Sequence, residues 1–232
     1  MTSISKIALA CAALVAASGA FAQKAGDNIV SIGLASINPD TSVGPLTNTP
    51  GLAQSAVTGA TAKVGSETTI SASWLRMYTD NVGVELTLGL PPTMTQDLTT
   101  PATGAHPAAA KIELRTPAVV AKYFFGVSQD KWRPYVGLGV AHVSFHNVKT
   151  NTADTTVQNL GGTAASFTSS WTPVYNAGLI YNLDEKWSIS GSVSYLPVRT
   201  SVTFVGRSPY GTTTGDVGLN TTDYIVRVGY KF

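Results

Sequence analysis

The 232-residue sequence contains very little cysteine and little charge. Its single cysteine, Cys11, lies in an N-terminal segment with the pattern of a removable leader, which excludes disulfides and thiol chemistry from the mature chain. Only 12% of the residues are charged, and 15 Lys and Arg nearly balance 13 Asp and Glu. Because no run of basic residues could neutralise phosphates, no nucleic acid is expected as a partner.

Long apolar runs are also missing beyond the leader, although 44% of the residues are hydrophobic. A membrane-spanning helix needs about twenty consecutive apolar residues. The hydrophobic residues are instead dispersed among 22 Gly, 12 Pro and many Ser and Thr. This composition favours many strands and turns over helices.

The first 22 residues have the pattern of a secretory signal peptide. Lys6 supplies a positive charge, residues 7–17 are apolar, and the small residues Ala20 and Ala22 mark a cleavage site before Gln23. We therefore predict that residues 1–22 are removed and that residues 23–232 form a single domain.

The C-terminal segment Thr222–Phe232 alternates with a period of two, which is typical of a strand with one apolar and one polar face. Its even positions are aromatic or β-branched throughout. A soluble edge strand is one interpretation. The aromatic last residue, Phe232, favours a transmembrane β-strand, whose lipid-facing side ends in an aromatic girdle.

Seven more segments show strand patterns, with registers left open near Arg76 and Pro117. They are Asn28–Ile37, Glu67–Tyr78, Val82–Leu90, Lys111–Phe125, Arg133–Asn147, Phe167–Asn182 and Trp187–Phe204.

The connections between these eight segments alternate long and short. Long polar loops are expected over residues 38–66, 91–110, 149–165 and 206–221. Bacterial outer-membrane barrels have this asymmetry, with short periplasmic turns, longer extracellular loops and both termini in the periplasm. A lipocalin-like soluble barrel would not sort its loops by end. We predict an all-β fold, an eight-stranded antiparallel up-and-down transmembrane β-barrel in the outer membrane.

Aromatic residues cluster at the end of this barrel that carries the short turns. Such a ring is expected at a membrane interface, where amphipathic rings prefer to lie. The predicted girdle consists of Tyr78, Tyr123, Trp132, Tyr181, Trp187 and Tyr230, with Phe125 and Phe232 beside it.

Several motifs resemble the outer membrane protein W family of small eight-stranded barrels. They are YTDNVGVEL from Tyr78, PAVVAKYFF from Pro117, RPYVGLGV from Arg133 and the ending GYKF from Gly229. The resemblance implies a monomer that lets small, mainly hydrophobic molecules pass, entering from outside and leaving sideways into the bilayer. An alternative is a plugged barrel whose loops 38–66 and 206–221 contact other cells, phage or lipopolysaccharide. Expected partners are outer-membrane lipids, lipopolysaccharide and the barrel-assembly machinery, which by resemblance recognises the terminal Phe232.

The inward positions are small or polar, in contrast to the large apolar side chains that the family carries at constrictions. This pattern indicates either a more polar permeant or apolar contacts from loops such as Leu46–Ala56. The charged inward residues either line the passage or pair with one another, since an unpaired buried charge is costly. The predicted lumen-lining residues are Glu85, Thr87, Lys122, Asn176, Ser194 and Arg227.

Catalysis and metal binding are not expected. His142 and Ser144 resemble the His-x-Ser of outer-membrane lipid A deacylases, but no carboxylate is placed to orient the histidine. His142 and His146 are about 13 Å apart on a strand, too far for one ion, and His106 lies in a loop. No cofactor is implied.

Overall fold

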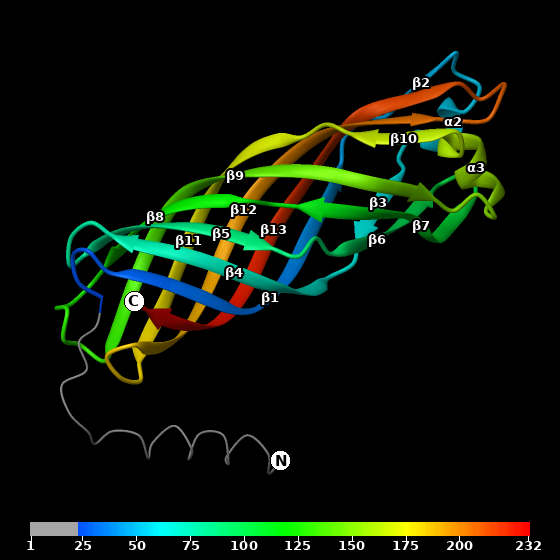
Figure 1. Ribbon diagram of the computed structural model, residues 1–232. Helices are drawn as coiled ribbons and strands as arrows, with labels where there is room; N and C mark the ends of the chain where they lie inside the picture. Colours follow the sequence, from blue (N-terminus) through cyan, green and yellow to red (C-terminus); the bar gives the residue numbers. More distant parts are fainter. Residues whose placement is uncertain (1–22) are drawn as a thin grey trace, which may run out of the picture.

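The computed structural model describes residues 23–232, so the predicted signal peptide lies outside the described residues. Eight long strands close into an antiparallel barrel, with an extension at the end away from the C-terminus (Figure 1). Each pairs with the next along the chain, and the last pairs with the first. They are β1 (Asn28–Val43), β4 (Glu67–Met77), β5 (Val82–Gly89), β8 (Ala118–Phe124), β9 (Trp132–Thr150), β11 (Ser170–Asn182), β12 (Trp187–Val205) and β13 (Thr212–Lys231).

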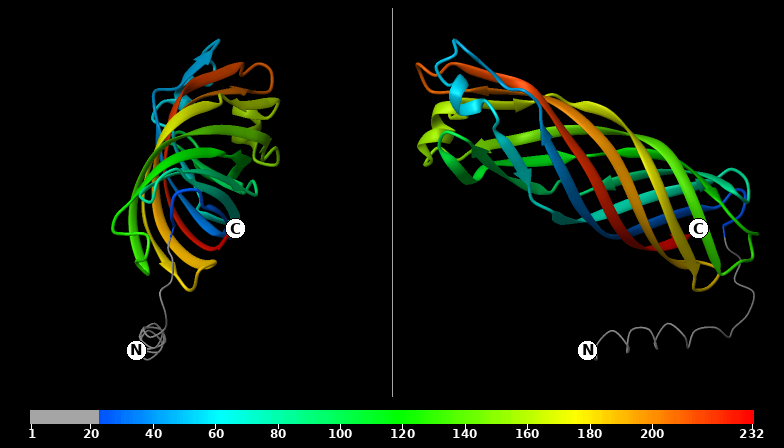
Figure 2. Two further views of the ribbon diagram at one scale, coloured as in Figure 1. Left: turned by 60° about the vertical axis from the view of Figure 1, so that its left-hand side comes forward. Right: turned by 180° about the vertical axis from the view of Figure 1, so that it is seen from behind.

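The described residues form thirteen strands rather than the eight predicted. The prediction of four long polar loops was wrong, because much of this sequence pairs into the extension, seen from two sides in Figure 2. In β6, for example, buried Met94 alternates with Thr93 and Thr95, which is a strand pattern in a Thr-rich stretch. The additional elements are β2 (Thr47–Thr49), β3 (Thr61–Val64), β6 (Thr93–Thr100), β7 (Gly104–Arg115), β10 (Ala164–Phe167), α2 (Gln54–Val57) and α3 (Thr155–Gly161).

The predicted strand Lys111–Phe125 is not continuous. It divides at Thr116 and Pro117 into β7 and β8, because proline has no N–H to donate to a ladder. The Pro117 carbonyl still accepts a hydrogen bond from the His142 N–H at 3.0 Å. Near Arg76 the register is regular, with Arg76 opposite Val84.

The outer face of the barrel is apolar. Large side chains on alternate positions of every barrel strand are exposed, among them Val30, Ile32, Leu34, Leu86, Val119, Leu138, Val140, Val226 and Val228. An apolar surface of this extent has to be covered, and a lipid bilayer covers such a belt in transmembrane barrels. No helix in the described part of the chain has the length and apolar content to cross a membrane.

Asp154 fastens α3 in the extension. Its Oδ1 accepts hydrogen bonds from the Thr156 and Val157 N–H groups, an N-cap. Its Oδ2 contacts Nδ1 of buried His106 at 2.8 Å. The hydrogen bond with the His106 ring and those from the helix N–H groups lower the pKa of Asp154. The resulting stabilisation is present above the ordinary carboxyl pKa and is lost as the pH falls through the lowered value.

Replacing this cap loosens α3. Asp154→Ala removes about 1 kcal/mol of helix stabilisation, so amide hydrogens of residues 155–161 exchange about fivefold faster at neutral pH, measured by mass spectrometry. Asp40→Ala, at an exposed position of β1, leaves this exchange unchanged. The account of the cap is wrong if α3 exchanges at the wild-type rate in Asp154→Ala.

Candidate binding chamber and its lateral opening

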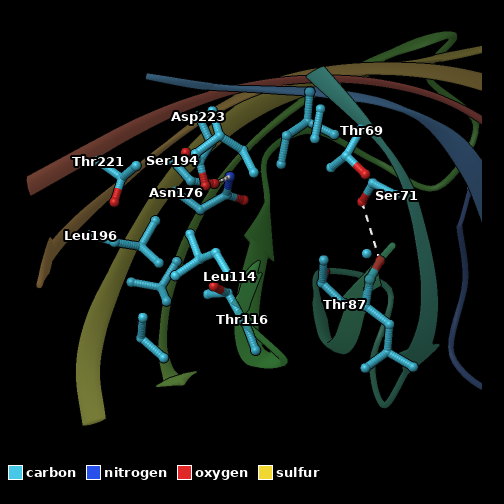
Figure 3. Close-up of a pocket in the computed structure, with 18 of the residues that line it drawn as sticks. Thr69, Ser71, Thr87, Leu114, Thr116, Asn176, Ser194, Leu196, Thr221 and Asp223 are labelled. Carbon is cyan, nitrogen blue, oxygen red and sulfur yellow. Dashed lines mark hydrogen bonds between the residues drawn. The ribbon is translucent and has the colours of Figure 1, made fainter. Parts of the chain in front are cut away.

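A cavity of about 100 Å³ lies inside the barrel, and Figure 3 shows residues that line it. Its wall is largely apolar, contrary to the expectation of a small and polar lumen. The apolar lining includes Leu114, Val120, Val143, Val174, Leu196, Val198 and Leu219. We call this cavity the chamber.

The apolar lining arises where the inward face of β12 changes character. Ser190, Ser192 and Ser194 occupy the inward positions of β12 nearer the short-turn end. Leu196 and Val198 occupy the next inward positions, toward the extension. Leu219 on the neighbouring strand lies opposite Val198. Following the inward positions of this strand beyond Ser194 would have identified the apolar wall from the sequence.

Glu85 and Arg227 form the floor of the chamber, and Lys122 supports it from beneath as the second partner of Glu85. Glu85 lies between Lys122, with Nζ and Oε2 2.8 Å apart, and Arg227, with Nη1 and Oε1 3.4 Å apart. All three are at most 7% exposed. Arg227 also donates two hydrogen bonds to Ser71 Oγ, which sequence analysis did not single out. The structure therefore brings Glu85, Lys122 and Arg227 into one paired cluster.

Between this floor and the short-turn end of the barrel, which we call the region below the floor, packed side chains fill the interior. The Lys122 ammonium lies 4.4 Å from the centre of the Tyr135 ring, and Tyr135 packs on Phe124. A Cβ on Gly178 would lie 2.6 Å from the Tyr135 ring, so the inward glycine makes room for the tyrosine rather than opening a pore. The cluster is completed by Ile29, Leu75, Met77 and Ile180.

The wall of the chamber is interrupted between β5 and β8. Pairing of these strands ends at Thr87 and Ala118, and the chain pairs again only at Thr93 and Glu113, between β6 and β7. Leu88 and Leu90 border this interruption. They are 50% and 59% exposed on the outer face, and they also line the chamber. The chamber therefore opens sideways to the apolar exterior, at the level of exposed Ile70, whose carbonyl accepts from the Leu90 N–H.

Prolines make this interruption tolerable in a membrane. Unpaired backbone groups are costly in hydrocarbon, and Pro91, Pro92 and Pro117 at its edges have no N–H group to leave unpaired. The Pro92 carbonyl is paired with the Leu114 N–H at 3.0 Å.

Two smaller cavities continue from the chamber into the extension, whose far end we call the loop end. A cavity of about 20 Å³ shares Leu114 and Leu219 with the chamber, and one of about 70 Å³ beyond it shares Gln96 and Val217 with the small cavity. Leu46 lines the outermost cavity, under α2 and α3. Apolar contacts from the loop segment Leu46–Ala56 are thus present at this end.

The remaining predicted lining residues lie around the chamber. Thr87 donates to Glu85 Oε1 at 3.1 Å, and Asn176 donates to Ser194 Oγ at 2.9 Å. All of the predicted residues except Lys122 border the chamber itself.

The predicted girdle residues lie on the outer surface at the short-turn end. The tilted rings of Trp132 and Tyr181 lie with their centres 4.3 Å apart, and Trp187 meets Tyr230 edge to face at 5.0 Å. The predicted girdle does not include further exposed aromatics nearer the extension, although the alternation of their strands places them on the outer face. These are Trp171, Tyr175, Tyr195 and Tyr224.

The histidine and serine of the deacylase-like motif make separate contacts. His142 lies against the ring of Trp171, and Ser144 Oγ contacts His146 Nε2 at 3.2 Å instead. Glu113, opposite His146, is bonded to Arg115 and Asn147. His142 and Ser144 are therefore not hydrogen-bonded to each other in the way that the deacylase resemblance would require. Among the described residues, no group of three metal-ligating side chains is present.

Comparisons with known proteins agree on one family. The model of the OmpW family matches residues 24–232. Outer membrane protein W of Vibrio cholerae is 28% identical over 97% of this chain and 97% of its own length. That of Salmonella typhimurium is 31% identical over 85% and 84%. The crystal structure of OprG from Pseudomonas aeruginosa superposes with a TM-score of 0.81 at 26% identity, covering 92% of this chain and 99% of that one.

The floor cluster makes an ordered prediction about stability. Glu85→Gln leaves the buried cations Lys122 and Arg227 without their shared carboxylate, and breaking a buried pair in this way costs about 3 kcal/mol. Lys122→Met leaves a neutral Glu85–Arg227 pair and costs less. Urea unfolding in lipid vesicles, followed by tryptophan fluorescence, measures both free energies. A larger loss for Lys122→Met, or none for Glu85→Gln, contradicts the assignment.

Proposed function

This chain belongs to the OmpW family of outer membrane proteins, and from that premise we propose that it carries small, mainly hydrophobic molecules passively into the outer membrane. A molecule enters at the loop end, occupies the chamber and leaves sideways between β5 and β8 into the bilayer. The short turns and both termini lie in the periplasm, and the barrel acts as a monomer.

The observation that carries this proposal is that the barrel interior is blocked at the floor, whereas the wall of the chamber is interrupted between β5 and β8. Straight passage along the barrel axis would have to displace Glu85, Lys122 and Arg227 together with the packed rings beneath them. The sideways route is bordered by Leu88 and Leu90, and by prolines without donor groups. An apolar molecule gains by following the second route, because burial away from water is favourable along all of it.

The line of apolar cavities supports entrance from the loop end. The cavities share lining residues in sequence, from Leu46 under α2 through Gln96 to Leu114 in the chamber. Small rearrangements of side chains such as Met94 and Phe145, which border the narrow middle cavity, would join them. Methionine adapts easily to such changes.

Blocking the chamber tests the route. Ala118 lines it beside the opening and Ala121, on the same strand, faces outward. In outer-membrane vesicles with a lipopolysaccharide outer leaflet, we expect Ala118→Phe to reduce uptake of a fluorescent naphthylamine dye to the level of protein-free vesicles. Ala121→Phe, the matched control, keeps the wild-type rate.

If wild-type protein does not accelerate dye uptake, the proposed transport is wrong and the alternative of a plugged barrel that binds cells, phage or lipopolysaccharide through its loops gains support. If Ala118→Phe and wild type take up the dye equally fast, the proposed route through the chamber is wrong, while transport by the protein stands.

The exposed terminal ring of Phe232 has a role in biogenesis under this proposal. Its N–H donates to the Asn28 carbonyl at 3.0 Å, while the side chain is 68% exposed. The ring therefore remains accessible to the barrel-assembly machinery. It also extends the predicted aromatic girdle.

Deleting Phe232 is expected to impair insertion into the outer membrane of cells more than refolding in detergent, since only the first process needs recognition of the ring. Heat-modified migration on gels measures the folded fraction in both settings. Phe232→Tyr, which keeps an aromatic terminus, inserts normally. Equal losses for the deletion in both settings would reduce Phe232 to a packing role.

A further inference from the structure

Three polar side chains cross one wall of the otherwise apolar chamber. Asn176 on β11 is opposite Ser194 on β12, which is opposite Asp223 on β13. Figure 3 shows the three side chains close together, and all three line the cavity. We call them the polar row.

Two acceptor atoms in the polar row have no partner. Asn176 uses its amide donors on Ser194 Oγ at 2.9 Å and the Val193 carbonyl at 3.1 Å. Its Oδ1 and Asp223 Oδ1 are both buried, and neither receives a hydrogen bond from the described residues. A buried acceptor left unpaired costs about 1–3 kcal/mol, so both atoms would gain from a donor in the chamber.

The donors of the floor are already committed elsewhere. Arg227 donates to Ser71 and Glu85, and Lys122 is paired with Glu85. The hydroxyl of Thr221, near Asp223 on β13, donates to the Leu219 carbonyl. The unpaired acceptors therefore face the chamber without a donor supplied by these neighbours.

The surroundings define what would fit. Leu114, Val143 and Leu196 favour an apolar body, and the polar row favours a head that donates hydrogen bonds. An alkane would leave both acceptors unpaired. A carboxylate head would place a further acceptor beside Asn176 Oδ1 and Asp223 and would leave all of them without a donor.

We propose that the chamber is a binding site for small amphipathic molecules, with an alkyl or aryl body and a head that donates hydrogen bonds: a hydroxyl to either Asn176 Oδ1 or Asp223, or an ammonium to both. This deepens the proposed function and depends on it, because it assigns a preferred class of molecule to the same chamber. One hydrogen bond of ordinary net strength corresponds to about a tenfold preference over the headless analogue.

Four eight-carbon probes test the preference: n-octane, 1-octanol, octylammonium and octanoate. The protein is placed in lipid nanodiscs with methyl-labelled leucine, and the signals of Leu196 and Leu219 report occupancy of the chamber. We expect 1-octanol or octylammonium to saturate these signals at about tenfold lower free concentration than n-octane. Preference for the alcohol alone identifies a neutral donor, and preference for the ammonium identifies a charged one. Octanoate binds most weakly.

Substitutions in the polar row separate its role from that of the apolar wall. Asp223→Leu and Asn176→Leu keep a similar size and remove one acceptor each, so the advantage of the donor-bearing probe falls toward that of n-octane. Thr172→Val is the matched control, because it removes a buried hydroxyl of β11 that is bonded to the Pro197 carbonyl and does not line the chamber. It keeps the wild-type preference. Asp223→Asn retains a side-chain acceptor and provides a second test if Asp223→Leu does not fold. We expect this variant to keep the preference for 1-octanol over n-octane. It loses any preference for octylammonium.

The outcomes distinguish this inference from the proposed function. If n-octane reaches the chamber as readily as 1-octanol and octylammonium, or if octanoate binds best, the polar row is not a head-group site and the inference alone fails. If none of the four probes perturbs Leu196 or Leu219, the chamber receives no ligand, and the proposed function fails with it.

Discussion

The structure depends on one constraint: in hydrocarbon, every backbone donor and acceptor needs a partner. Closing the sheet from β13 back to β1 meets that need around the barrel. The interruption between β5 and β8 is an exception whose sequence reduces its cost, since prolines at its edges carry no N–H and the carbonyls of Pro92 and Pro117 are bonded to neighbouring strands. An opening to the bilayer can therefore persist at this point of the wall.

The floor closes the chamber along the barrel axis, and the opening leaves its side accessible. Glu85 neutralises part of the charge of Lys122 and Arg227 at the point where the interior changes from packed rings to an apolar cavity. Buried charges are stable only when paired, so this cluster resists the separation that an axial pore would require. The apolar cavity above it reaches the outer face beside Leu88 and Leu90. Under the proposed function, a ligand held there by the polar row leaves by that side.

Much of the barrel could be predicted from the sequence, because side-chain alternation reports directly which face a residue occupies. The closing strand at Tyr224–Phe232 and the inward Glu85 and Arg227 follow from that period alone. The extension could not be predicted in the same way: Thr-rich segments such as β6 have weak alternation, and their strands form only by pairing with distant residues. The chamber was missed because small inward residues below Ser194 suggested a polar lumen, whereas Tyr135 fills that space and Leu196 begins the apolar wall above. The opening depends on the relative positions of Leu90 and Thr116, which no local pattern encodes.

Photolabelling of the native protein in a bilayer tests the central claim, that the chamber opens to lipid and ends at the floor. Lipids with a diazirine in the acyl chain react with whatever side chains they contact, and mass spectrometry identifies the labelled residues. The account predicts labels on the inward-facing Leu114 and Leu196 as well as on the outer face, and none on Leu75 or Tyr135 below the floor. Labels confined to outward residues such as Leu86 and Val119 would contradict it.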